Sequence, residues 1–190
     1  MAQFLVMKAV AGKNFCILRT LKNAPDANFV RKGVAVASWP DNVQYWMDPS
    51  FPKQVQLSDS VSNDDEALVI SSKLKELIEG LKPSNLEFLP LTIIDHKGKV
   101  ASSEYFIANC THLQDCIDQK ASDLVWNRID PTLIASVKKL VVDESKIPPE
   151  TLVFRMKHFP KSIIVSRALS EAISGKGFSG ILFRELDTIR

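Results

Sequence analysis

The pattern of apolar and polar residues is clearest in the middle of the chain, from residue 67 onward. Leu68–Ile70 is a short aliphatic run typical of a buried strand, and Ser71 after it suits the N-cap of a helix, where a hydroxyl can accept a free backbone N–H. Leucine and isoleucine then recur at helical spacing as far as Gly80, and Pro83 follows as a helix stop. With the apolar run Leu86–Ile94 beyond it, this part of the chain predicts a strand, a helix and a second strand.

Shorter apolar runs predict the remaining elements of the second half. Asp95–Gly98 is typical of a turn, and Glu104–Asn109 predicts the strand that pairs with the one before that turn. The spacing of apolar residues indicates helices over His112–Trp126 and Pro131–Val137. Two further strands are predicted on either side of the stiff Ile147-Pro148-Pro149 turn, at Leu140–Val142 and Leu152–Met156.

One segment of this pattern occurs twice. Leu68–Gly80 reads LVISSKLKELIEG and Ile163–Gly175 reads IIVSRALSEAISG, and the two align without a gap. Ser71 and Ser166 take the same place, as do a leucine, a glutamate, an isoleucine and a glycine at equivalent positions. An internal duplication would produce this match, and so would the general preferences of short strand–helix–strand units. Either origin predicts two similar strand-Ser-helix-Gly-strand units.

The first third of the chain reads as strands and loops. Phe4–Val10 and Phe15–Leu21 flank the turn-forming Gly12–Asn14 and predict a β-hairpin. Trp39–Pro52 holds three prolines and four aromatic residues, which predicts a loop pinned by its aromatic side chains. Asp59–Glu66 holds four acidic residues among serine and asparagine and predicts a solvated linker.

These elements together predict an α+β fold, with a mixed or largely antiparallel sheet and several short helices packed on it. A chain of 190 residues with 45% hydrophobic types is long enough to bury one substantial core. We therefore expect a single domain over residues 1–190.

Charge and cysteine content narrow the possible functions. Lys and Arg number 24 against 22 Asp and Glu, a formal net charge of +2, which excludes a strongly basic nucleic-acid-binding chain. The N-terminus lacks a basic run ahead of its apolar stretch, and no apolar run approaches the length of a membrane span, so a cytoplasmic protein without nucleic-acid or membrane partners is expected. Cys16, Cys110 and Cys116 are scattered and odd in number, which indicates reduced thiols.

No motif in the chain favours catalysis. Gly175–Gly180 matches the G-x-G-x-x-G pattern, but it follows a predicted helix and precedes a predicted strand, the reverse of the order that presents a helix N-terminus to a phosphate. Cys110, His112 and Cys116 offer three possible metal ligands, where a structural zinc site usually has four. We therefore expect no catalytic residue, no cofactor and no metal, and a structural role for the glycines as a helix stop and tight turn.

Protein binding is the class of function that remains. The aromatic segment Trp39–Pro52 carries side chains of the kind enriched at interfaces, and the acidic segment Asp59–Glu66 could speed association with a basic partner. The rings could instead close the edge of the core, and the acidic residues could form an ordinary solvated linker. The candidate partner-binding residues are Trp39, Tyr45, Trp46, Phe51, Asp59, Asp64, Asp65 and Glu66.

Seven short segments, in their order and spacing, carry a family resemblance. They are Leu68–Ser71 with its helix, Leu86–Leu91, Tyr105–Asn109, Cys116–Asp118 followed by Ser122, Leu152–Arg155, Ile164–Ser166 with its helix, and Phe178–Phe183. Through them, residues 65–185 resemble a family of bacterial immunity proteins, the small cytoplasmic antidotes encoded beside polymorphic secreted toxins, formerly a family of unknown function. Residues 1–60 match that family only loosely.

The resemblance implies a protein that binds one cognate toxin stoichiometrically, either plugging its active site or holding it in an inactive shape. It implies no catalysis and no cofactor. Among the matching polar residues, Asp118 with Ser122 is expected to form an internal bridge or cap, and Arg155 to be buried beside a paired acid. Two alternatives stay open: an adaptor or chaperone for a secreted effector, and a small Cys-dependent enzyme that reverses a toxin's modification.

Overall fold

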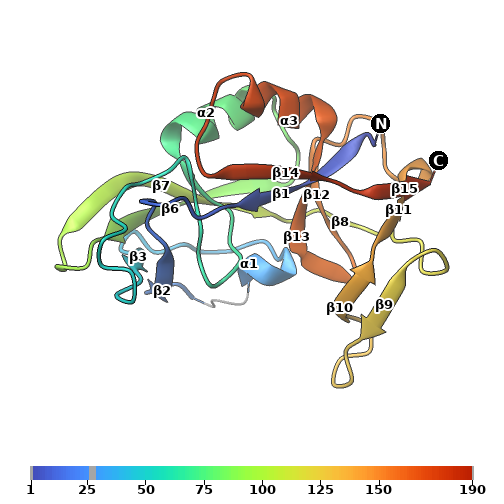
Figure 1. The fold of residues 1–190 in the computed structure, drawn as a ribbon, viewed down its shortest axis with the longest axis horizontal. Helices are drawn as coiled ribbons and strands as arrows, with labels where there is room; N and C mark the ends of the chain where they lie inside the picture. The colour runs from blue at the N-terminus through green and yellow to red at the C-terminus, as the bar shows by residue number, and fades with distance from the viewer. Residues whose placement is uncertain (1, 26–28, 190) are drawn as a thin grey trace.

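Strands dominate the structure, and two sheets hold most of them. The computed structural model describes residues 2–25 and 29–189. Its architecture is broadly α+β, as the sequence predicts, but mostly β, because the described residues form fifteen strands and only three short α-helices. Figure 1 shows the two longer helices together on one side of the molecule and a β-hairpin that projects from the rest of it at the lower right.

The larger sheet has six strands, which are β2 (Leu18–Lys22), β3 (Gln44–Met47), β4 (Ser60–Val61), β5 (Val69–Ser71), β6 (Leu86–Ile94) and β7 (Val100–Cys110). Their order is β2-β3-β6-β7-β5-β4. The antiparallel pair β6 and β7 forms its centre and is joined by the predicted turn, where Gly98 has a φ of 76° that glycine adopts without strain. β3 pairs with β6 in parallel, which makes the sheet mixed.

The smaller sheet has five strands, which are β1 (Phe4–Ala9), β8 (Leu113–Gln114), β12 (Val153–Met156), β13 (Phe159–Ser166) and β14 (Ile181–Glu185). Their order is β14-β1-β13-β12-β8, so the first strand of the chain lies between two of the last. Two two-stranded ribbons complete the β structure: β9 (Asp123–Trp126) with β10 (Ile134–Lys139), and β11 (Val141–Asp143) with β15 (Asp187–Ile189).

The helices are α1 (Phe29–Lys32), α2 (Ser72–Gly80) and α3 (Arg167–Ser174), with a short 3-10 helix at Glu144–Lys146. Both predicted serine caps are confirmed. The hydroxyl of Ser71 accepts the backbone N–H of Leu74 at 3.4 Å, and that of Ser166 accepts the backbone N–H of Leu169 at 3.2 Å. None of the helices in the described residues combines the length and the apolar character that a membrane span requires.

The segments around α2 and α3 have the same local topology. β5 before α2 and β6 after it both pair antiparallel with β7, which lies between them. β13 before α3 and β14 after it both pair antiparallel with β1 in the same way. One such unit belongs to each sheet, and the buried faces of the two helices meet in one apolar core, with Leu74 and Ile78 from α2 and Leu169 and Ile173 from α3.

A close approach between β4 and the turn before β14 also joins the sheets. The backbone N–H of Ser60 in β4 donates to the backbone oxygen of Ser179, which precedes β14, at 3.1 Å. Gly180 has a φ of 74°, and a Cβ on it would lie 2.3 Å from the backbone oxygen of Ser60 and 2.6 Å from Oγ of Ser58. The approach therefore requires glycine at this position, which gives the last glycine of the Gly175–Gly180 segment a packing role.

Three predictions for the first third of the chain are wrong. β1 and β2 do not form a hairpin, because every side chain of Phe4–Met7 is buried and the strand pairs with β13 and β14 instead. Trp39–Pro52 is not all loop, since Gln44–Met47 lies between its prolines and forms β3. Asp59–Glu66 is not wholly solvated, because Ser60 and Val61 form β4 and are fully buried.

The predicted helices over His112–Trp126 and Pro131–Val137 are wrong as well. This part of the chain forms β8, a turn and the β9–β10 hairpin. The carboxylate of Asp118 accepts hydrogen bonds from two backbone N–H groups of the turn, which favours a turn over a continued helix. In β9 the side chains of Leu124 and Trp126 are half-buried and alternate with exposed ones, so the true period is two.

The polar residues predicted to act inside the fold do so in different ways. Asp118 caps its turn as expected, and the Ser122 hydroxyl accepts the backbone N–H of Val141 in β11 at 2.9 Å. Arg155 is fully buried as expected. The prediction that an acidic residue pairs with it is wrong, because none of the described carboxylates forms an ion pair with Arg155. Its guanidinium donates to the backbone oxygens of Cys110 and Pro160 instead.

Candidate functional site

The predicted aromatic cluster is largely built into the core. Tyr45 in β3 is fully buried, and its hydroxyl donates a hydrogen bond to the carboxylate of Asp65. Burial and that hydrogen bond raise the pKa of Tyr45 far above its ordinary value, so the hydroxyl remains a donor. Trp39 packs edge-on against Phe29, with ring centroids 5.3 Å apart, and its Nε1 donates to the backbone oxygen of Pro90 at 2.7 Å. Both rings therefore serve the packing of the larger sheet.

The other two predicted aromatic residues are more accessible. Trp46 is half-buried, and the ammonium of Lys22 lies 3.9 Å from the centroid of its ring, a cation–π contact that covers one face. Phe51 lies in the turn region after β3 and is 42% exposed. The segment thus presents one exposed ring to a partner rather than four.

The predicted acidic segment is partly neutralised by arginines. Asp64 lies 3.7 Å from Arg19, and Asp65 lies 3.6 Å from Arg31. Arg31 also donates to the backbone oxygens of both acidic residues, at 2.9 and 3.0 Å. Glu66 is exposed and forms no ion pair within the described part of the chain. Because two of the carboxylates are paired, the negative electrostatic potential toward a basic partner is weaker than the number of acidic residues suggests.

Asp59 has a structural position. Its carboxylate accepts the backbone N–H of Ser179 at 2.8 Å, the hydroxyl of Ser179 at 2.7 Å and the hydroxyl of Ser71 at 3.0 Å. Burial alone would raise the pKa of Asp59, but these hydrogen bonds outweigh it and hold the pKa below its ordinary value. Asp59 therefore ties the N-cap of α2 to the turn before β14, and so one sheet to the other.

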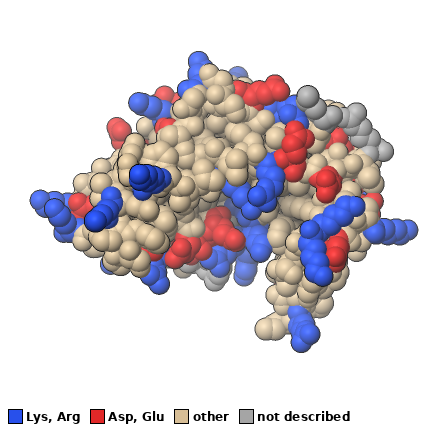
Figure 2. Space-filling view, in the orientation of Figure 1, with Lys and Arg blue, Asp and Glu red and all other residues tan. Residues whose placement is uncertain are grey.

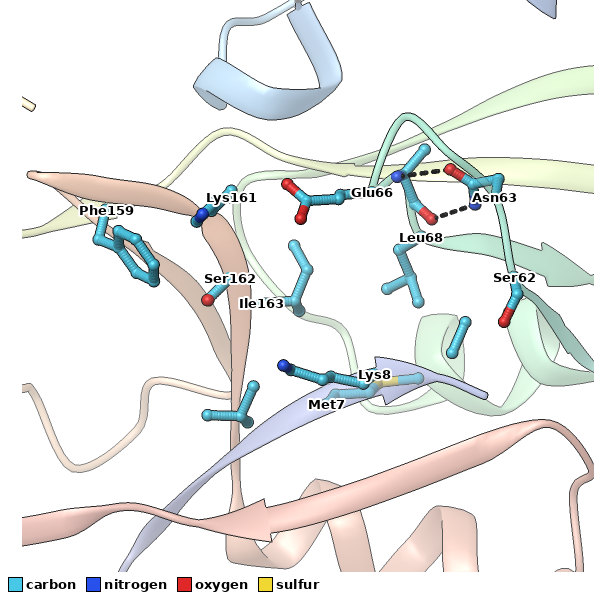
Figure 3. Close-up of a pocket in the computed structure, with 13 residues that line it drawn as sticks. Met7, Lys8, Ser62, Asn63, Glu66, Leu68, Phe159, Lys161, Ser162 and Ile163 are labelled. Carbon is cyan, nitrogen blue, oxygen red and sulfur yellow. Dashed lines mark hydrogen bonds between the residues drawn. The ribbon is translucent and has the colours of Figure 1, made fainter. Parts of the chain in front are cut away.

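A groove that the sequence did not predict crosses the smaller sheet between the loop before β5 and the β9–β10 hairpin. It consists of two adjoining hollows of about 330 and 510 Å³. Figure 3 shows the first hollow, with Lys8, Lys161 and Glu66 directed into it from three different segments. The second extends to β10 and β14. The residues that line both hollows are Val6, Lys8, Phe159, Lys161 and Ser162.

The groove is open because the side chains of β1 alternate between the two faces of the smaller sheet. Leu5 and Met7 point into the core beneath α2 and α3, whereas Phe4 and Val6 point into the core on the other face of the smaller sheet. Lys8 follows Val6 on that second face, beyond the edge of its apolar core, and is exposed. The hollow at this point is accessible to solvent and is bordered by Lys8, Glu66 and Lys161, which are all exposed.

Basic residues outnumber acidic ones by five to three in the lining of this groove, which we call the lysine groove. Figure 2 shows basic side chains on both sides of the recess between the hairpin and the rest of the molecule, with acidic side chains beside them. Three acidic residues also line it, Glu66, Glu185 and Asp187, and Glu185 is paired with Arg167. The basic residues are all exposed, and none forms an ion pair with another described residue: Lys8, Lys138, Lys139, Lys161 and Arg184.

The β9–β10 hairpin with its turn at residues 127–133, which we call the arm, borders the lysine groove and presents an apolar tip. Ile129 at the tip is 96% exposed. The turn is fixed by side-chain caps, since Oδ1 of Asn127 accepts the backbone N–H groups of Ile129 and Asp130 at 2.8 and 3.1 Å. Asp130 in turn caps Thr132 at 3.0 Å. Asn127, Asp130 and Pro131 are turn-forming residues that could have indicated this hairpin, although the pattern of apolar residues predicted helices here instead.

The cysteine candidates lie in the core. Cys16, Cys110 and Cys116 are buried thiols. Burial raises the pKa of Cys16 to about 11 and that of Cys116 to about 12, and it also raises the pKa of Cys110. Nucleophilic attack and metal binding both require the thiolate, which such environments disfavour. Within the described residues, no group of three or more His, Cys, Asp and Glu side chains could hold a metal ion.

Comparison with known protein families identifies the class of this protein. The model of an immunity protein family, Imm11, matches residues 15–188. The chain therefore belongs to the Imm11 immunity protein family, which confirms the resemblance and extends it toward the N-terminus. The match includes the arm and all the basic residues of the lysine groove except Lys8. No curated protein matches the chain.

Proposed function

We propose that this protein neutralises a cognate secreted toxin by direct, stoichiometric binding, in the cytoplasm of a bacterium that competes with others through a polymorphic toxin system. The observation that carries the proposal is the match of the Imm11 family over residues 15–188. The protein would act without catalysis or a cofactor, either by plugging the active site of the toxin or by holding the toxin in an inactive shape.

The contact surface predicted from the sequence remains one candidate within this proposal. Of its residues, Phe51, Asp64 and Glu66 have exposed side chains, so they are the members that a partner reaches without rearrangement. Neutralising Asp64 and Glu66 together should slow association at low salt if they steer a basic toxin. Asp59 and Asp65 are unsuitable for this test, because their carboxylates accept hydrogen bonds inside the fold.

The decisive experiment joins binding to protection. The full chain is tagged and co-expressed with the product of the gene immediately upstream, and both co-purification and growth are measured. A stable one-to-one complex with restored growth would support the proposal. A complex without rescue would favour an adaptor or chaperone of a secreted effector.

Rescue without a stable complex would instead favour an enzyme that reverses the toxin's modification. Replacing Cys110 and Cys116 singly by serine then tests that alternative, since an enzyme dependent on either thiol would lose protection. We expect both variants to protect fully, because the two thiols are buried and protonated.

A further inference from the structure

We propose that the lysine groove and the arm form the docking surface for the toxin, with an acidic segment of the toxin in the groove and Ile129 inserted into an apolar pocket beside that segment. This inference rests on the proposed function and deepens it, because it assigns the surface and the chemistry of the partner. It also reverses the charge expected from the acidic segment of the sequence.

The charges of the groove call for an acidic occupant. Its five basic side chains come from β1, β10, β13 and β14 and converge on one recess without ion pairs among the described residues. Like charges held together repel, and an acidic partner relieves that repulsion as it binds. Of the three acidic residues in the lining, Glu185 is already paired with Arg167, whereas Glu66 and Asp187 form no ion pair among the described residues and can orient the partner.

Ile129 supplies the apolar anchor. A large aliphatic side chain that is 96% exposed on a capped turn gains nothing for the fold of the free protein, and its burial against a partner is favourable. The next most exposed large aliphatic residue, Val100, is 64% exposed and lies at the start of β7. Among the described residues, Ile129 is the most exposed large hydrophobic one. The hairpin that carries it lines the groove through Ser136, Lys138 and Lys139 of β10.

The arm is pre-organised for this role. Trp126 and Ile134 form the last strand pair before the turn of the arm. The ring of Trp126 packs edge-on against His158, with ring centroids 5.6 Å apart, and the backbone N–H of Ile134 donates to the backbone oxygen of His158 at 2.8 Å. Nδ1 of the same histidine lies 2.9 Å from the backbone oxygen of Thr132. A hairpin whose turn is capped, and whose strand ends next to the turn are fixed in this way, loses little conformational entropy when it binds.

The groove suits a protein better than a nucleic acid. Single strands are held by aromatic rings on which bases stack, and the aromatic ring in the lining, Phe159, has the ammonium of Lys161 4.7 Å from its centroid. Acidic side chains interrupt the basic lining, and the net charge of the chain is only +2. An apolar tip also has no counterpart in a phosphate backbone.

The test measures the kinetics of binding between the full-length protein and the purified product of the upstream gene. The Lys138→Glu/Lys139→Glu variant should slow association about tenfold or more at low salt, and the difference should shrink at high salt because exposed charges are screened. The Ile129→Ser variant should raise Kd about tenfold or more, mainly through faster dissociation, as expected for a buried anchor.

Two control variants match these changes elsewhere on the surface. Lys97→Glu/Lys99→Glu alters two exposed lysines in the β6–β7 turn and changes the net charge equally. Val100→Ser removes the next most exposed aliphatic side chain. Both controls should bind as the unaltered protein does, and circular dichroism should show that all four variants are folded.

The outcomes separate this inference from the proposed function. If the unaltered protein neither binds the upstream product nor protects against it, the proposed function and the docking surface are both overturned. If it binds and protects while the groove and arm variants behave like their controls, only the docking surface is overturned. Two further results would overturn the docking surface if toxin binding stayed unchanged. One is that Lys138→Glu/Lys139→Glu abolishes binding of labelled DNA in a titration. The other is that Ile129→Ser abolishes a dimer of the chain in sedimentation.

Discussion

Arg155 is a fully buried cation whose hydrogen bonds go to backbone oxygens. Nε donates to Cys110 at 3.1 Å, Nη1 donates to Pro160, and Nη2 has no hydrogen-bond partner among the described residues. Burial lowers the pKa of Arg155 to about 10, which means that the fold holds this charge at a cost in free energy. Gly33 closes over the side chain, since a Cβ there would lie 3.0 Å from Cδ of Arg155.

This environment predicts an unequal response to two substitutions of Arg155. Arg155→Ala should lower the free energy of unfolding by about 3–5 kcal/mol, because it leaves a cavity and removes donors from two backbone oxygens. Arg155→Met should cost less than half as much, because it fills the space and brings no charge to desolvate. Urea denaturation measures both. Equal losses would show that the guanidinium hydrogen bonds, rather than volume, stabilise this region.

Asp59 predicts a dependence of stability on pH. Its pKa in the folded protein lies below the unfolded value of about 3.9, so its stabilising contribution is complete above that pH and is lost as the pH falls through the folded pKa. Asp59→Asn should therefore lower the free energy of unfolding by about 1–3 kcal/mol at pH 7, and by less as the pH falls below about 3.9, for example at pH 3. Urea denaturation at both pH values checks this, and a loss that is the same at both would contradict a role for the carboxylate charge.

At the scale of elements, the two helix caps provide a matched pair. Ser166→Ala removes one cap and should cost about 1 kcal/mol. Ser71→Ala should cost more, because the Ser71 hydroxyl also donates to Asp59 at 3.0 Å. In the double variant with Asp59→Asn, the excess cost at Ser71 should disappear, which a double-mutant cycle by urea denaturation measures. Equal costs at the two serines would mean that the bond to Asp59 contributes no stability.

The sequence pattern correctly predicted those elements whose structure depends mainly on residues nearby in the chain. The expected strand Leu86–Ile94 matches β6 residue for residue, and both serine caps were identified from the sequence alone. The errors fall where distant partners decide the structure. β1 pairs with strands more than 150 residues away, and β9 is too short for a period of two to stand out from a helical one.

The candidate site was harder to predict for the same reason. Tyr45 and Trp39 have the composition of an interface segment, but their contacts with Asp65, Phe29 and Pro90 come from other parts of the chain and place them in the packing. The lysine groove could not be recognised along the sequence, because its basic residues come from four separate strands and form no charged run. The turn-forming residues around Ile129 could have indicated the arm, but the pattern of apolar residues predicted helices there.

For the whole molecule, we expect the two sheets to unfold together as one domain over residues 1–190. One apolar core contains Ile70 and Ala108 from the larger sheet and Leu5 and Val165 from the smaller sheet. Each sheet also has an apolar core on its other face, but the shared core between them couples their stability.

The three tryptophans of the chain allow that coupling to be tested. Trp126→Phe leaves the fluorescence of Trp39 and Trp46 beside the larger sheet, and Trp39→Phe/Trp46→Phe leaves Trp126, which packs against His158 at the end of β9. Within each variant, the urea midpoint from fluorescence should coincide with that from far-ultraviolet circular dichroism, because one cooperative transition is expected. Separate transitions would show two independent domains.

Adding Gly180→Ala to each tryptophan variant makes the test stricter. The new Cβ would lie 2.3 Å from the backbone oxygen of Ser60 at a φ of 74°, so it strains the contact that joins the sheets. If the sheets are coupled, the substitution lowers the free energy of unfolding by about 2–4 kcal/mol as reported by either set of tryptophans. If it shifts the signal of one set and leaves the other unchanged, the contact at Gly180 stabilises one sheet alone and the single-domain expectation fails.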